Sequence, residues 1–231
     1  MTTNYTGPVE ELNWASRLQA HVVTPGTRPR IHGYDVREDL IENITFSGLI
    51  FLTLTRELPS SETLLAFEKT IMFLAPISVA EAPVHASVLA RLCGSNTSGI
   101  TGVAGITLGQ QAHFIIEEHK ELFEMLSAGN KNPESLFCHQ NEGELQETGL
   151  LIKTLEKAGL TPPNVCRRLR PVAAALTVLH ECCNLTDPGL LESVLVMARI
   201  PCTLAEGRAV QPGGFRNYPI DLPKFAYRDE E

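Results

Sequence analysis

Apolar residues recur at helical spacing along most of this chain, whereas the alternating pattern typical of strands is nearly absent. In residues 38–61 the leucines and isoleucines keep one apolar face, and Pro59 ends the run. Ser61 then opens a second periodic run, which predicts an N-cap followed by a helix. Further helices are expected at 84–93, 147–158, 171–182 and 188–198. The pattern therefore predicts an all-α protein.

A small, apolar stretch follows the third expected helix and is punctuated by glycines at 94, 99, 102, 105 and 109. Glycine costs about 1 kcal/mol per helix-interior position relative to alanine, so close packing must offset the loss. The segment "GITGVAGITLG" accordingly predicts a central buried helix that its neighbours approach closely. Residues 114–126 continue as an amphipathic helix, and the polar residues 127–146 predict a loop or the start of a subdomain.

Charge and cysteine content narrow the class of protein. The 231 residues carry a formal net charge of −8, and the basic residues are scattered apart from Arg167, Arg168 and Arg170. Nucleic acid is not expected as a partner, because backbone binding needs a concentrated positive face. The six cysteines include no CxxC pair, so we expect no metal site but buried, reduced thiols in a cytoplasmic protein. The first residues lack the basic start and apolar core of a signal peptide. Stretches such as "FSGLIFLTL" are too short to span a membrane, so no membrane partner is expected.

Four stretches, in this order along the chain, resemble the citrate synthase superfamily, especially its short citryl-CoA lyase-like members. The resemblance covers roughly residues 28–228. The stretches are "RIHGYDVREDLIENITFSGLIFLTLTRELPSSETLLAF", "EAPVHASVLARLCGS", "GVAGITLGQQAHF", and "VLVMARIPCTLAEGRA" followed by "FRNYP".

The resemblance implies a citrate synthase-like helical fold that dimerises and closes a small domain over an acyl-CoA. It divides the chain into an N-terminal extension (1–27), the first part of a large helical domain (28–126), a reduced small subdomain (127–170), and the closing helices and C-terminal tail of the large domain (171–231). Coenzyme A is expected as a thioester substrate, with no tightly bound cofactor.

The family's chemistry rests on two histidines and an aspartate. The carboxylate takes a proton from the acyl-CoA methyl, one histidine hydrogen-bonds the enol oxygen, and the other polarises the oxoacid carbonyl. This division of labour is physically sensible, because a weakly acidic methyl proton is abstracted only where the enolate is stabilised.

The two histidine positions of the family are altered in this sequence. Ala80 stands where the first histidine is expected, so His85, five residues later, would have to replace it; the alternative is a structural histidine beside Arg91. The second is His113, which lies one place late in its motif and is followed by two bulky residues instead of two glycines. One residue of slip rotates a side chain by about 100° around a helix.

The expected aspartate position holds no carboxylate. Pro171, Val172 and Ala173 occupy the start of the helix where the family carries its base, and Glu181 lies more than two turns away. This departure removes the obvious route to an enolate.

The arginines match the family better. Arg199 and Arg216 stand where the family binds substrate carboxylates, since a guanidinium can form two parallel charge-assisted bonds. Arg167 and Arg168 could contact the phosphates of coenzyme A. Solvated surface arginines are the alternative for all four.

Two functions remain open. The first, narrowly favoured, is a citryl-CoA lyase-like enzyme that makes or breaks a carbon–carbon bond in an acyl-CoA or related carboxylate, with His85 and His113 as catalytic groups. The second is a non-catalytic homologue, forming a homodimer or pairing with a paralogue, that acts as a ligand-binding, regulatory or structural subunit. Convergence of both histidines with Arg199 and Arg216 on one cleft would favour the enzyme.

Overall fold

The computed structural model describes residues 19–130 and 132–212. Its contacts divide the chain into two compact units, Met1–Leu58 and Pro59–Glu231. Each unit is described by itself below. The four-segment division implied by the family resemblance stays a prediction.

The first unit combines a small antiparallel sheet with two helical segments. Asp35 begins the first of these, because its Oδ1 accepts from two backbone N–H groups of the following turn. Thr45 begins the second by accepting from the N–H of Gly48. The continuous apolar run predicted over 38–61 is therefore wrong as a single helix, since the Thr45 cap starts a new one. The elements are β1 (Val23–Thr24), β2 (Arg30–Ile31), β3 (Tyr34–Asp35), the π-helical η1 (Val36–Leu40) and α1 (Phe46–Thr55).

The second unit is helical. Ser60, one residue before the predicted N-cap, starts α2 by accepting from the N–H of Thr63. Asn96 caps α4 in the same way. The elements are α2 (Ser61–Leu74), α3 (Ala82–Leu92), α4 (Thr97–Glu118), α5 (Lys120–Ser127), η2 (Ser135–Phe137), α6 (Glu142–Lys157), η3 (Asn164–Arg168), α7 (Pro171–Cys182) and α8 (Pro188–Ala209). The all-α prediction is confirmed for this unit.

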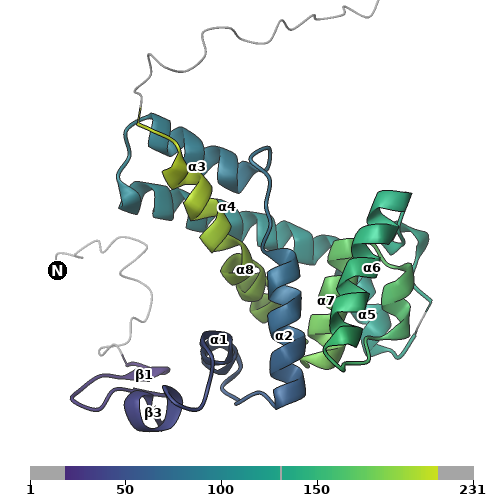
Figure 1. Cartoon of the computed structure of the whole chain (residues 1–231), viewed down its shortest axis with the longest axis horizontal. Helices are drawn as coiled ribbons and strands as arrows, with labels where there is room; N and C mark the ends of the chain where they lie inside the picture. Colours follow the sequence, from purple (N-terminus) through teal and green to yellow (C-terminus); the bar gives the residue numbers. More distant parts are fainter. Residues whose placement is uncertain (1–18, 131, 213–231) are drawn as a thin grey trace, which may run out of the picture. The chain divides into compact units, whose positions relative to one another are not determined.

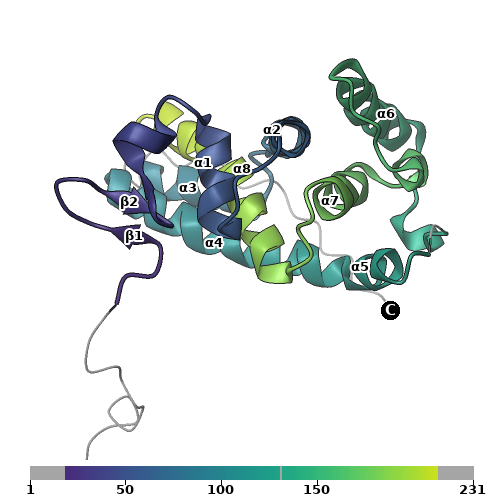
Figure 2. The ribbon, with the colours of Figure 1, turned by 90° about the horizontal axis from the view of Figure 1, so that it is seen from below.

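Within this unit, two groups of helices flank α2. The long helix α8 packs along α4 and α3, while α7 packs against α6, η3 and α5 (Figure 1). Helix α2 contacts α7, α8 and α6, and Figure 2 shows α2 nearly end on between the two groups.

The close helix approach is made by α8, not by the glycine-rich part of α4. A Cβ added to Gly207 would lie 3.0 Å from Ile100 Cγ2 and 3.2 Å from Ser87 Cβ. In contrast, a Cβ on Gly102 or Gly105 would meet nothing within 4 Å. The predicted central buried helix is therefore wrong for one face of α4, which is open within the described structure.

Helix α8 is long and apolar enough to cross a membrane by length and composition alone. Glu192 and Arg199 interrupt its apolar residues. One such helix is weak support for a membrane span, since a core helix of a soluble protein passes the same test. Here α8 packs against three other helices.

Candidate functional site

Arg199, the predicted carboxylate clamp, is held by acceptors from the protein. The residue is 8% exposed, and its Nε donates to the carbonyl oxygen of Leu74 at 3.3 Å. Its Nη1 donates to Gln111 Oε1 at 2.9 Å and lies 3.5 Å from Glu81 Oε2. Gln111 in turn donates from Nε2 to the same Glu81 oxygen at 2.8 Å. Burial lowers the pKa of Arg199, whereas Glu81 opposes that shift.

This network ties four structural elements together. Leu74 ends α2, Glu81 is the N-cap of α3, and Gln111 and Arg199 lie on α4 and α8. Glu81 also accepts from the N–H of Ser78 at 2.9 Å. The described contacts of Arg199 are therefore structural, and its binding of a substrate carboxylate stays a prediction.

His113 lies on the exposed side of α4 and pairs with α8. Its Nδ1 donates to Glu192 Oε1 at 2.9 Å. This hydrogen bond, reinforced by the charge of Glu192, raises the pKa of His113.

The structure does not bring His85 and His113 together. His85 is exposed on α3, two residues before Ser87, which contacts Gly207 near the C-terminal end of α8. His113 instead pairs with Glu192, fifteen residues or about 22 Å of helix before Gly207. No described contact joins the two histidines, and neither lines a cavity described below.

The remaining predicted arginines give no common site. Arg216 lies outside the described residues. Arg167 pairs with Glu156 on α6, and Arg168 is exposed. Their contact with coenzyme A stays a prediction.

A cavity of about 330 Å³ opens at the start of α7. Its wall includes Pro171, Val172 and Ala173, the positions at which the family resemblance expects an aspartate. The end of α4, the first half of α6 and the N-cap of α7 complete it with charged side chains and an imidazole. These are Glu118, His119, Glu144, Glu147 and Arg170.

His119 is 5% exposed and lines this cavity. Its Nδ1 lies 2.7 Å from the carbonyl oxygen of Ile115. A carbonyl only accepts, so the ring proton sits on Nδ1. Burial, assisted by the charge of Arg170, lowers the pKa of His119 and keeps the ring neutral. Nε2 therefore carries a lone pair.

Arg170 supplies the cavity's cation. Its backbone N–H donates to the carbonyl oxygen of Phe137 at 2.8 Å, and Pro171 starts α7 immediately after it. The side chain is half-buried, and no described residue hydrogen-bonds or ion-pairs with its guanidinium. A guanidinium in this state can bind a carboxylate through two parallel bonds.

The carboxylates of the cavity are only partly engaged. Glu144 accepts from the backbone N–H of Gln140 at 2.7 Å, just before α6 begins. Glu118 and Glu147 are exposed, and neither ion-pairs with a residue that the structure describes. The cavity thus combines three carboxylates with one guanidinium and a neutral imidazole.

Sequence reasoning missed His119 as a site residue and treated Arg170 only as part of a basic run. Proline at the first position of a helix could have placed Arg170 at the N-terminus of α7. No local pattern could have paired it with His119, fifty-one residues earlier.

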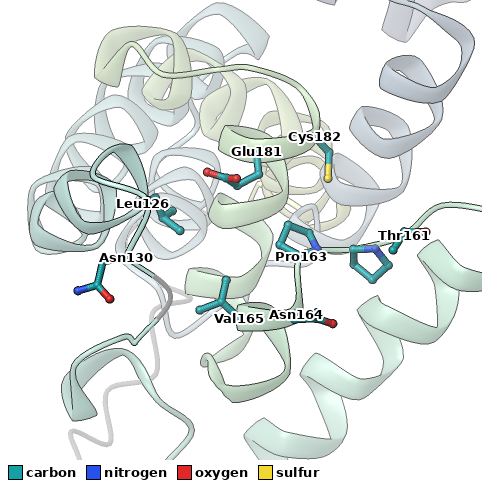
Figure 3. Close-up of a pocket in the computed structure, with 10 residues that line it drawn as sticks. Leu126, Asn130, Thr161, Pro163, Asn164, Val165, Glu181 and Cys182 are labelled. Atoms are coloured by element: carbon teal, nitrogen blue, oxygen red, sulfur yellow. The ribbon is translucent and has the colours of Figure 1, made fainter.

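Two further cavities adjoin each other around Cys182. One, of about 410 Å³, is lined by residues that include Leu126, Glu181 and Cys182 (Figure 3). The other, of about 310 Å³, shares Thr161, Pro162 and Cys182 with it. None of the three cavities described here is lined by His85, His113 or Arg199.

The cysteines are free thiols and form no metal centre in the described part of the chain. Cys166 and Cys183 are buried, and burial raises the pKa of each thiol to about 12. Cys93 is exposed, so the expectation that the thiols are buried is wrong for this residue.

No family model and no curated protein matches the sequence. Solved structures match the fold. Citryl-CoA lyase from Hydrogenobacter thermophilus superimposes with a TM-score of 0.64 and 15% identity, over 93% of this chain and 96% of that chain. The Methanosaeta concilii ATP citrate lyase D541A mutant in complex with (3S)-citryl-CoA gives 0.61 and 14%. ATP citrate lyase from Methanothrix soehngenii in complex with citrate and coenzyme A gives 0.56 and 14%.

Each of the two ATP citrate lyase matches covers 96% of this chain and 43% of the other, so this chain spans less than half of those proteins. At such identities the likeness concerns the fold. The chain therefore has a citrate synthase-like fold, similar to that of citryl-CoA lyase over nearly the whole length of both proteins.

Proposed function

We propose that this protein is a non-catalytic citrate synthase-like homologue that binds a small carboxylate in the cavity at the start of α7. The observation that carries the proposal is the half-buried Arg170 guanidinium, which lines this cavity and has no partner among the described residues. The cavity volume of about 330 Å³ suits a small organic acid.

The same cavity lacks the group that family chemistry requires. Pro171, Val172 and Ala173 supply no carboxylate where a base is expected. Neither predicted histidine lines this cavity, and Arg199 already donates to two protein oxygens. In the condensation direction an acyl-CoA gives an enolate only where a base removes its methyl proton, and the positions at the start of α7 supply none. These features support binding over carbon–carbon bond chemistry.

Calorimetric titration of the carboxylates citrate, oxaloacetate and propionate, and separately of acetyl-CoA, into the full chain tests the proposal. We expect at least one of the three carboxylates, which include a monocarboxylate, to bind, and Arg170→Gln to abolish that binding. Arg168→Gln is the matched control, because it removes the same charge from an exposed position two residues away. Equal losses in both variants, or no binding of any carboxylate, would overturn the proposal. Loss of acetyl-CoA binding alone in Arg168→Gln would support the predicted contact with coenzyme A.

A second candidate, a citryl-CoA lyase-like enzyme, is favoured by the neutral imidazole of His119. Its free Nε2 could take the hydroxyl proton of a citryl thioester as the carbon–carbon bond breaks, releasing oxaloacetate and the enolate of acetyl-CoA, which is then protonated. Oxaloacetate release from citryl-CoA, lost in His119→Gln, would establish this function. No turnover by the native protein would exclude it.

We also propose that the open face of α4 packs against a second copy of the chain. Ile106 and Phe114 are 76% and 64% exposed on this helix, and Gly102 and Gly105 leave room for close approach. Sedimentation of the native protein should give a dimer, and Ile106→Glu a monomer. Met72→Glu, at an equally exposed apolar side chain of α2, should stay dimeric. A monomeric native protein would refute the dimer.

A further inference from the structure

We infer that the ligand of the α7 cavity is a zwitterion of the amino-acid type, carrying one carboxylate and one ammonium group. The inference rests on the proposed function, since it assigns the carboxylate end of the ligand to Arg170. It goes further by naming the chemistry of the other end, which the charges of the cavity determine.

The cavity is too acidic for a polycarboxylate. Arg170 provides one positive charge, against the carboxylates of Glu118, Glu144 and Glu147. Among the described residues none of these glutamates has a lysine or arginine partner within ion-pair distance. A ligand such as citrate would satisfy Arg170 with one carboxylate and place its other carboxylates near three like charges. An ammonium group would instead be attracted to them.

The hydrogen-bonding capacity of His119 points the same way. Its Nδ1–H is used by the carbonyl of Ile115, so only the Nε2 lone pair is available to a ligand. An ionised carboxylate has no proton to donate to it, whereas an ammonium group has three. His119 therefore adds to the cavity a neutral hydrogen-bond acceptor, which suits an ammonium group. Arg170 is a charged donor, which suits a carboxylate.

The rest of the wall is apolar and limits the size of the ligand. Ile115, Val172 and Ala173 contribute aliphatic surface to a cavity of about 330 Å³. These features fit an amino acid with a small, uncharged side chain, whose two charged groups meet Arg170 and the glutamates.

The test is a binding screen of every standard L-amino acid, together with citrate, against the full native chain. The tightest-binding amino acid is then compared by calorimetry with its des-amino acid, which keeps only the carboxylate, and with its decarboxylated amine. We expect the decarboxylated amine to bind at least about tenfold more weakly, because the half-buried Arg170 is left unpaired. The des-amino acid should bind about fivefold more weakly, because the glutamates that it leaves unpaired are partly solvated.

Variants separate the two ends of the site. Arg170→Gln should weaken the amino acid and its des-amino acid alike. Glu147→Gln should weaken the amino acid about fivefold or more and leave the des-amino acid unchanged or tighter. Glu142→Gln is the matched control, because this exposed glutamate also lies on α6 but does not line the cavity.

The outcomes distinguish this inference from the proposed function. Suppose that citrate or a des-amino acid binds through Arg170 while no amino acid binds more tightly. That result overturns the zwitterionic ligand but keeps the proposed carboxylate site. Amino-acid binding that is insensitive to Glu147→Gln and Glu118→Gln also overturns the zwitterion. If no carboxylate of any kind binds, both proposals fail.

Discussion

Replacing Arg199 with alanine should destabilise the fold rather than remove a ligand contact. The substitution deletes the donors to Leu74 and Gln111 and leaves these acceptors buried or half-buried. A hydrogen bond from a charged group contributes about 1.5–3 kcal/mol, and the longer bond to Leu74 lies at the weak end. The ion pair with Glu81 adds about 1 kcal/mol at most, because Glu81 is partly solvated. We therefore expect a loss of about 3 kcal/mol.

Chemical denaturation followed by circular dichroism measures this loss directly. For a chain of this size, ~3 kcal/mol corresponds to a fall in Tm of about 6–12 °C. Arg168→Ala is the control and should change stability by less than about 0.5 kcal/mol, because its side chain is exposed. If Arg199→Ala were as stable as this control yet lost carboxylate binding, the structural role of Arg199 would be refuted. Its predicted role in binding a substrate carboxylate would then be supported.

Three other perturbations follow from single contacts. Gly207→Ala should lower the free energy of unfolding by about 1–3 kcal/mol, because the added methyl group would lie 3.0 Å from a side-chain carbon of α4. Chemical denaturation measures this change, and unchanged stability would show that α8 can move away from α4 at little cost. The pKa of His113 is raised in the folded state, so its pairing with Glu192 stabilises the fold fully below the ordinary histidine pKa and is lost as pH rises through the raised value. NMR titration should show this pKa falling in Glu192→Gln, and no change would exclude the pair in solution. A thiol reagent at neutral pH should label Cys93 before Cys166, since burial raises the pKa of the latter to about 12; peptide mapping with the reverse order would contradict the packing.

The helices were largely predictable because their signals are local. Apolar periodicity located α2, α3 and α7 to within two residues, whereas α6 begins at Glu142, five residues before its predicted start and inside the polar stretch 127–146. The predicted helix bounds were also wrong where a cap residue divides an apolar run and where a helix continues past a proline. Thr45 divides the first apolar run because its hydroxyl binds a backbone N–H, a competition that hydrophobic spacing does not report. Helix α8 continues past Pro201 to Ala209, where Gly207 packs against α3 and α4, so tertiary contacts outweigh the local penalty of proline.

The exposed face of α4 could not be predicted from its glycine-rich composition. Glycine allows close helix packing, but the sequence does not say which side of the helix a neighbour takes. The neighbour of the buried face is α8, whose own Gly207 makes the close contact with Ile100. The glycines at 102 and 105 lie on another side of the helix, where the described structure leaves space.

The functional side chains were harder to predict, because their roles depend on contacts between distant parts of the chain. Arg199 matched the family in type, but its acceptors Gln111 and Glu81 lie 88 and 118 residues earlier. Likewise, the cavity forms only because α4, α6 and α7 converge. A single sequence gives no signal for such convergence.

The two arginines show why residue type alone does not assign a role. Arg199 and Arg170 carry the same group, with five N–H donors in a rigid fork. In Arg199, donors are directed at protein oxygens from α2 and α4, so a ligand would have to displace them at the cost of leaving those oxygens unpaired. In Arg170 the donors have no described partner and face a cavity, so a carboxylate can bind without breaking any contact. The arginine with unused hydrogen-bonding capacity, rather than the one that matches a motif, is therefore the better assignment for ligand binding in this fold.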